Sequence, residues 1–328
     1  MGEIITVHVG SAGCRLGAAF WRSIAAAHGI GPEGMPSAGA PRDDGDAEIL
    51  FSVTPAQRYQ PRALFVGDAE LIEELRRRDL GHMFQPASYL PYGSGAWLSD
   101  GRGPASDDPK LLQGAMDRLR RLTDVCRSAE GFLFTHALGG RTASRLAPRL
   151  MEQVAKAYPE MTLVSLMVLP ASDLVDGSPM TAPYSAVASA AEVADCAHLV
   201  ILLDNLAAYE ACNGAPGVEH PSCEHMNEVL ARAIGAFTAP LRRPREGRVT
   251  LAARVAELAP EPGQNFASLA QGVPGGAPLA ADLGGLTRVL GHFDCTRANR
   301  AYVHWMERDG LDLATLDRAR ARLGALRG

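Results

Sequence analysis

The sequence has little of what marks nucleic-acid binders, membrane proteins or disulfide-rich secreted proteins. Its formal net charge is −5, so it lacks the basic excess with which DNA- and RNA-binding proteins neutralise phosphates. No apolar run reaches the length of a membrane-spanning helix. The six cysteines form no C-x-x-C pair, and the chain opens on a β-rich run rather than a signal peptide. We therefore predict a cytoplasmic protein with reduced thiols and without a nucleic-acid or membrane partner.

Apolar residues and glycine are plentiful instead: 47% of the 328 residues are hydrophobic and 34 are glycine. Such a chain can bury a sizeable core in one large domain or two. Apolar runs alternate with segments of helical spacing, which predicts an α/β fold with a doubly wound parallel sheet. The expected strands span residues 3–9, 62–66, 132–134, 161–169 and 198–203, with a further short strand at 287–292. The expected helices cover about residues 16–27, 71–78, 110–127, 146–157, 184–195, 204–212, 223–240, 249–258 and 313–326.

Two of the expected strands lead through glycine-rich turns into helices. The strand at 132–134 is followed by Gly139, Gly140 and Thr142, and the strand at 3–9 by Gly10 and Gly13. Glycine lets backbone N–H groups approach a ligand closely, and a helix N-terminus attracts anions, so both patterns are typical of phosphate sites. Strand–glycine–helix turns also occur as plain connections. If the two strands are neighbours, the turns can hold one nucleotide between them at the carboxyl-terminal edge of the sheet.

Several segments resemble tubulin, in the same order along the chain. The opening run M-G-E-I-I-T-V-H-V-G-S-A-G-C-R-L-G-A-A-F-W is similar to the tubulin N-terminus, and G-G-R-T-A-S-R at 139–145 to its glycine motif. The run A-P-Y-S at 182–185 resembles the end of the sugar-binding loop, and R-A-Y-V-H-W at 300–305 the C-terminal helical segment. Asn205 and Asn227 fall at the positions of two guanine-binding asparagines.

The resemblance implies a tubulin-type, Rossmann-like GTPase domain at residues 1–222. A core helix and turn at 223–246 follow, and then a reduced intermediate domain with a C-terminal helical segment at 247–328. It further implies that GTP or GDP is bound, and that the protein associates with itself or with other tubulin-like subunits. The nucleotide contacts that it predicts, residue by residue, are Gly10, Ser11, Ala12, Arg15, Ala96, Ala137, Gly139, Gly140, Arg141, Thr142, Asn205 and Asn227.

The chain departs from the family pattern in the phosphate motif. Arg141 and Arg145 replace glycines. Arg141 either contacts phosphate, which its guanidinium matches in geometry, or fills the cradle and excludes the nucleotide. The acidic motif for Mg²⁺ is reduced to Asp68 and Glu70; these could substitute for it, but a plain helix N-cap is the favoured interpretation of Asp68. The alternatives for the asparagines are helix capping for Asn205 and a satisfied core amide for Asn227.

The segment after the core helix departs furthest from the family. Thr250 and Ala252 stand where the family has an asparagine and an acid, and neither can activate water as a carboxylate does. Glu257, one turn further, is expected to face solvent. We predict weak or no GTP hydrolysis and name no catalytic residue.

Three rival interpretations remain. One is a regulatory or interaction protein on a degenerate tubulin scaffold, without bound nucleotide. Another is a small-molecule enzyme with His136 as its best candidate group. The third is a zinc site built from Cys212, His220, Cys223 and His225, whose spacing suits tetrahedral coordination; the alternative is a cysteine pair beside surface histidines.

Overall fold

The computed structural model describes residues 2–37, 46–78, 80–93, 108–139, 143–171, 182–213, 220–242, 248–261, 263–269, 278–279, 283–304 and 312–325. In this part of the chain an eight-stranded sheet has the order β10-β9-β8-β7-β6-β1-β4-β5. Every pair from β9 to β5 is parallel, and only β10 runs antiparallel. Its strands are β1 (Glu3–Val9), β4 (Ala63–Asp68), β5 (Tyr89–Tyr92), β6 (Ala129–Ala137), β7 (Thr162–Leu169), β8 (Leu199–Asp204), β9 (Phe266–Leu269) and β10 (Pro278–Leu279). The predicted parallel α/β sheet is confirmed.

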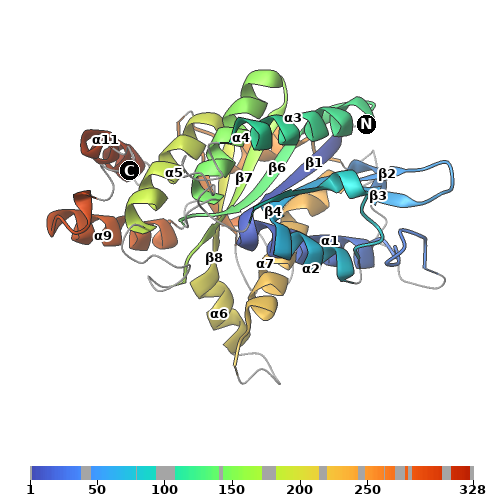
Figure 1. Ribbon diagram of the computed structural model, residues 1–328, viewed down its shortest axis with the longest axis horizontal. Coiled ribbons are helices and arrows are strands. Elements are labelled where there is room, and N and C mark those ends of the chain that lie inside the picture. The colour runs from blue at the N-terminus through green and yellow to red at the C-terminus, as the bar shows by residue number, and fades with distance from the viewer. Residues whose placement is uncertain are drawn as a thin grey trace.

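Helices cover both faces of this sheet, so the fold is doubly wound (Figure 1). One face carries α1 (Gly10–Ala27), α2 (Ala69–Arg77), α7 (Cys223–Thr238) and α8 (Leu251–Leu258), with α6 (Asn205–Asn213) against α7. The other face carries α3 (Pro109–Asp124), α4 (Ala143–Ala157), α5 (Ala182–Cys196), α9 (Gly284–Ala298) and α11 (Leu313–Ala325). A hairpin of β2 (Phe51–Val53) and β3 (Tyr59–Pro61) stands beside the sheet.

The central strands are apolar on both sides because both faces are covered. All eight residues of β7 are buried, as is typical of a strand inside a doubly wound sheet. Successive residues of β1 alternate between the two cores: Ile4 packs into the core under α1, and Ile5 into the core under α4. The strand period of two therefore divides one apolar run between two hydrophobic cores.

The residues after α7 join the same sheet and the same helical layer. β9 pairs with β8, and α9 and α11 both pack on α5. The expected strand at 287–292 is wrong, because these residues lie inside α9. The buried side chains Leu286, Val289, Leu290 and Phe293 follow the helical spacing of three, one and three. The domain boundaries at 222 and 246 stay a prediction. Among the described residues, no helix is both long and apolar enough to cross a membrane.

Candidate nucleotide site

The two glycine turns lie side by side at the carboxyl-terminal edge of the sheet. β1 and β6 are parallel neighbours, with His8 opposite Thr135. The chain leaves β1 through Gly10 into α1 on one face, and leaves β6 through Gly139 toward α4 on the other. Neighbouring strands whose helices diverge to opposite faces form a topological switch point, where open α/β sheets bind their ligands. The two strands that lead to Gly10 and Gly139 are therefore neighbours, as predicted.

Backbone geometry at these turns suits an anion. Gly10 has φ 75° and Gly139 φ 85°, a region that side chains other than glycine disfavour. Val9, the N-cap residue of α1, makes no side-chain hydrogen bond, and the first turn of α1 holds no acid. The first N–H groups of this helix thus have no side-chain acceptor and no carboxylate to repel an anion. Both features fit the phosphates of a nucleotide.

The predicted phosphate contacts are only partly within the described residues. Ser11 is exposed and Ala12 half-buried in the first turn of α1, while Ala137 is half-buried at the end of β6. Ala96, Gly140, Arg141 and Thr142 lie outside the described residues. The alternatives for Arg141 therefore stay open.

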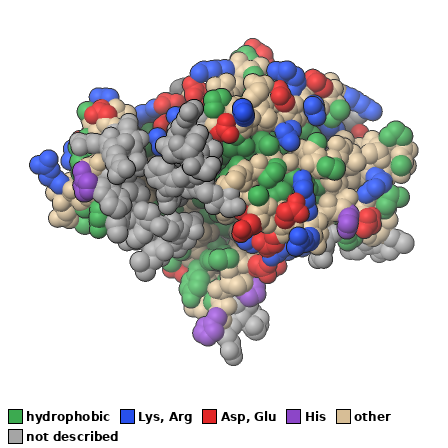
Figure 2. Space-filling view, viewed as in Figure 1, with side chains coloured by type: hydrophobic (Ala, Val, Ile, Leu, Met, Phe, Trp, Pro, Cys, Tyr) green, Lys and Arg blue, Asp and Glu red, His purple; other side chains and the backbone are tan. Residues whose placement is uncertain are grey.

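Arg15 makes an ion pair that the sequence did not reveal. Its guanidinium donates two hydrogen bonds to the Glu74 carboxylate on α2, of 3.1 and 2.9 Å. Glu74 also accepts from Arg78, which in turn donates to Glu224 in the first turn of α7. The pKa of Glu74 is lowered, most strongly by its hydrogen bonds with Arg15 and less by the hydrogen bond from Arg78. On the face shown in Figure 2, acidic and basic side chains are interspersed over this region.

Asn205 begins α6, directly after β8. The capping alternative fails for Asn205, because Asp204 accepts the Leu206 N–H instead, at 2.9 Å. Asn227 lies one turn into α7, which packs against both α1 and α6. Both asparagines are half-buried, and neither carboxamide forms a hydrogen bond to another described residue. Their donors and acceptors thus remain available to a ligand.

His136 is a buried structural group. Its Nε2 lies 2.8 Å from the Ser165 hydroxyl, and its Nδ1 lies 3.3 Å from the Ala137 carbonyl oxygen. Burial lowers the pKa of His136 to about 4. A side chain without exposed surface gives no support to the small-molecule enzyme interpretation.

The residues compared above with the family's acidic and catalytic positions make structural contacts here. Asp68 caps α2 by accepting from the N–H groups of Glu70 and Leu71, which confirms the N-cap interpretation. Thr250 caps α8 by accepting from the Ala253 N–H. Glu257, the only acid in residues 248–258, is exposed as expected and pairs with Arg254.

The segment before α8 is fixed to the opposite edge of the sheet. Arg248 donates to the Gly2 carbonyl and to Glu130, each at 3.0 Å, and Glu130 also accepts from the Leu251 N–H. Gly2 precedes β1, and Glu130 is the second residue of β6. This segment therefore lies at the strand starts, while the glycine turns lie at the strand ends.

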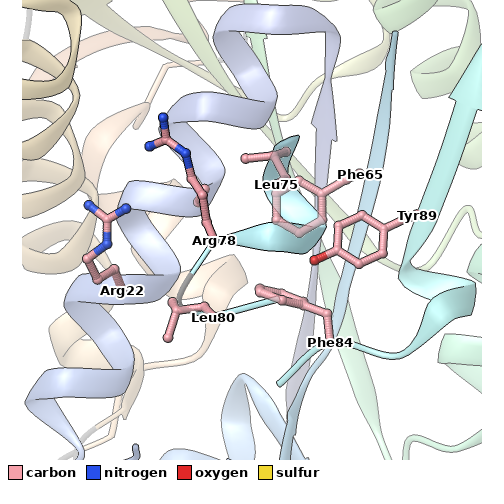
Figure 3. A pocket seen from close by; sticks show the side chains of 8 residues that line it. Arg22, Phe65, Leu75, Arg78, Leu80, Phe84 and Tyr89 are labelled. Atoms are coloured by element: carbon pink, nitrogen blue, oxygen red, sulfur yellow. The ribbon is translucent and has the colours of Figure 1, made fainter. Parts of the chain in front are cut away.

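Neither a metal cluster nor the small pocket in Figure 3 competes with the switch point. Among the described residues, no group of three or more His, Cys, Asp or Glu is arranged to hold a metal ion. His225 instead forms a capping box with Ser222. The pocket in Figure 3 lies between α1 and α2, and none of the predicted nucleotide contacts lines it.

Comparisons with known proteins agree with this architecture. Residues 3–213 match the family model described as "Tubulin/FtsZ family, GTPase domain". The tubulin alpha-2 chain of Schizosaccharomyces pombe is 30% identical over 269 residues, which cover 81% of this chain and 60% of that protein. The tubulin alpha chain of Eremothecium gossypii is 32% identical over 247 residues, 74% of this chain and 55% of that protein. The chain thus spans little more than half the length of these relatives. With a family model that matches well over half of its residues, the chain belongs to the Tubulin/FtsZ family and carries that family's GTPase domain.

Proposed function

We propose that this chain binds a guanine nucleotide at the switch point and hydrolyses it weakly or not at all. The observation that carries the proposal is the adjacency of the Gly10 and Gly139 turns on the parallel strands β1 and β6. Membership of a GTPase-domain family supports it. The phosphates would lie on the first turn of α1, where N–H groups and the helix dipole favour anions.

The base would lie toward Asn205 and Asn227. Asn205 follows β8, which is three strands away from β1 in the sheet, a distance of roughly 14 Å at the usual strand spacing. A carboxamide donates and accepts at once, as the edge of guanine requires. α6 and α7 pack together and present one asparagine each, so two amides are available to this end of the ligand.

Hydrolysis is expected to be lost because residues 248–258 offer no free carboxylate. Thr250 is committed to its cap, Ala252 carries no functional group, and Glu257 is paired with Arg254. No carboxylate of residues 248–258 is therefore free to position or activate an attacking water. Mg²⁺ would be held chiefly by the nucleotide, because Asp68 is used as a cap and only Glu70 remains of the reduced motif.

Self-association and a cytoplasmic location complete the proposal. The segment at 248–251 and the glycine turns occupy opposite edges of the sheet, which places them on opposite ends of a protomer. Head-to-tail contact between copies would bring these ends together. Sedimentation with GTP and Mg²⁺ tests assembly, and a protein that stays in the supernatant at every concentration would contradict head-to-tail self-association.

The central test pairs two glycine variants. Gly139 and Gly263 both have positive φ, 85° and 88°, and a Cβ at either meets no atom of the described residues closer than 4.0 Å. Gly139→Ala and Gly263→Ala should therefore lose similar stability, about 1–2 kcal/mol. Only Gly139→Ala should weaken GDP binding in a titration. Equal affinities in the two variants would contradict a phosphate site at this turn.

Nucleotide carried through purification gives a second test. Denatured protein should release GDP or GTP, which ion-exchange chromatography identifies. Absence of nucleotide, with no binding on titration, would favour the regulatory protein on a degenerate scaffold. Arg141→Gly then separates the two alternatives for that residue: affinity rises if the side chain blocks the cradle and falls if it contacts phosphate.

A further inference from the structure

One arginine of α9 reaches the end of the candidate site where the base would lie. Arg288 on α9 donates two hydrogen bonds to the Asp204 carboxylate, Nη1 to Oδ2 at 3.1 Å and Nη2 to Oδ1 at 2.8 Å. Its Nη2 also donates to the Pro170 carbonyl oxygen, at 2.9 Å. Asp204 is the last residue of β8, and Pro170 follows β7. A single guanidinium therefore joins the carboxyl-terminal ends of two neighbouring strands.

The first turn of α9 is shaped for this contact. A Cβ on Gly285 would lie 2.5 Å from Leu169 Cδ1 and 2.8 Å from Asp204 Oδ2, so any larger residue would displace one or both of these side chains. The Tyr184 ring meets Phe293 of α9 edge-on, and its hydroxyl donates to the Ala301 carbonyl, just beyond the end of α9, at 2.7 Å. Figure 1 shows α9 extending from the end of β8 past α5. The helix is thus anchored at both ends to the sheet edge and to the start of α5.

Asp204 connects this anchor to Asn205. Its Oδ1 accepts from Arg288 and from the Leu206 N–H, which fixes the first turn of α6. The Arg288 and Asp204 side chains are only 24% and 20% exposed, so their bidentate pair is better shielded from solvent than a surface ion pair. Any shift of Asp204 moves the backbone of the next residue, whose carboxamide has no other described partner.

We propose that Arg288 is a positioning residue for base recognition: through Asp204, it holds the Asn205 carboxamide in the orientation that selects guanine. This inference rests on the proposed nucleotide site. It makes α9 a part of that site, which acts through Asp204 and not through a contact with the nucleotide. A lysine at this position would keep the positive charge but lose the bidentate hydrogen bonds to Asp204.

The test compares Arg288→Ala and Arg288→Lys with a matched control, Arg320→Ala. Arg320 on α11 also makes a bidentate pair, with Asp294 on α9, and it forms no hydrogen bond to a described residue of β7 or β8. Titrations with GDP and with ADP measure affinity and base selectivity together. Arg288→Ala should lower GDP affinity about tenfold, the effect of one well-placed hydrogen bond, while changing ADP affinity little. Arg288→Lys should fall between, and Arg320→Ala should match the unaltered protein.

Hydrogen exchange without nucleotide gives a readout that does not depend on binding. The Leu206 amide should exchange faster in Arg288→Ala than in Arg320→Ala, because its acceptor has lost its anchor. Equal exchange in the two variants, or an unchanged ratio of GDP to ADP affinity, would overturn the role of Arg288 while leaving the proposed function intact. If the unaltered protein binds no GDP, the proposed function itself fails, and the positioning role fails with it.

Discussion

Gly13 in α1 lies directly against the Thr135 carbonyl oxygen of β6: a Cβ on Gly13 would be 2.3 Å from that oxygen. The helix that follows the first glycine turn thus packs on the strand that leads to the second. Since the obstacle is backbone, it cannot move aside as a flexible side chain would. This contact sets the distance between the two halves of the candidate phosphate site.

Gly13→Ala should therefore destabilise the protein by about 1–3 kcal/mol, the usual cost of overpacking, and weaken GDP binding. The measurements are urea unfolding and nucleotide titration. The control is Gly291→Ala in α9, where a Cβ meets no atom of the part of the chain that the structure describes within 4 Å. That substitution should stabilise the helix by about 0.5–1 kcal/mol and leave binding unchanged. A Gly13→Ala protein of full stability and affinity would mean that the turns need not be so close.

His136 should make stability depend on pH. Burial lowers its pKa to about 4 in the folded protein, from 6.5. The unfolded chain therefore takes up a proton first as the pH falls. The contribution of neutral His136 to the free energy of unfolding is complete above pH 6.5. It is lost progressively between pH 6.5 and 4, with a slope approaching 1.4 kcal/mol per pH unit. His8, whose pKa burial lowers to about 3, adds a loss of the same sign that continues to lower pH.

His136→Gln, which keeps a donor for Ser165, should flatten that slope when unfolding is measured at a series of pH values. The matched control for the loss of one imidazole is the exposed His82→Gln. Identical slopes in His136→Gln and the unaltered protein would show that His136 is not the group responsible.

GTP turnover should stay at the level of the blank in a phosphate-release assay, at any protein concentration. The physical reason is that Glu257, the one acid in residues 248–258, is already paired with Arg254. Glu257→Gln should change nothing, because Glu257 is exposed and paired with Arg254. Saturable turnover that disappears in Glu257→Gln would contradict this prediction and identify Glu257 as a water-activating group.

Local sequence patterns were sufficient to predict the strands and glycine turns at the carboxyl-terminal edge of the sheet. The apolar run at 3–9 became β1 with the same ends, and the glycine turns followed the strands as expected. The expected strand at 287–292 is wrong because the buried residues from Leu286 to Phe293 follow helical spacing, although Thr287 and Val289 are β-branched. β9 was not predicted, since four residues in a Gly/Pro/Ala-rich stretch gain their conformation by pairing with β8.

Long-range ion pairs were beyond the reach of the sequence. Arg15 and Glu74 are 59 residues apart, and Arg288 and Asp204 are 84 apart. Neither pair has a spacing that a helix or a strand would reveal. Asp204 directly follows the expected strand at 198–203, but its partner is evident only from the position of α9. The predicted ligand role of Arg15 therefore has to be tested against its pairing with Glu74.

Glu74→Gln tests that role. In the unaltered protein Glu74 partly neutralises Arg15, and the two side chains are 37% and 43% exposed, so the pair contributes no more than about 1 kcal/mol to stability. Removing the acid should leave stability nearly unchanged and raise GTP affinity about two- to fivefold, more than GDP affinity, because the guanidinium then meets the extra phosphate charge uncompensated. The gain should vanish in high salt, which screens exposed charges, and in Arg15→Ala/Glu74→Gln. If the double variant keeps the gain, Arg15 is not its source, and the residue serves only to tie α1 to α2.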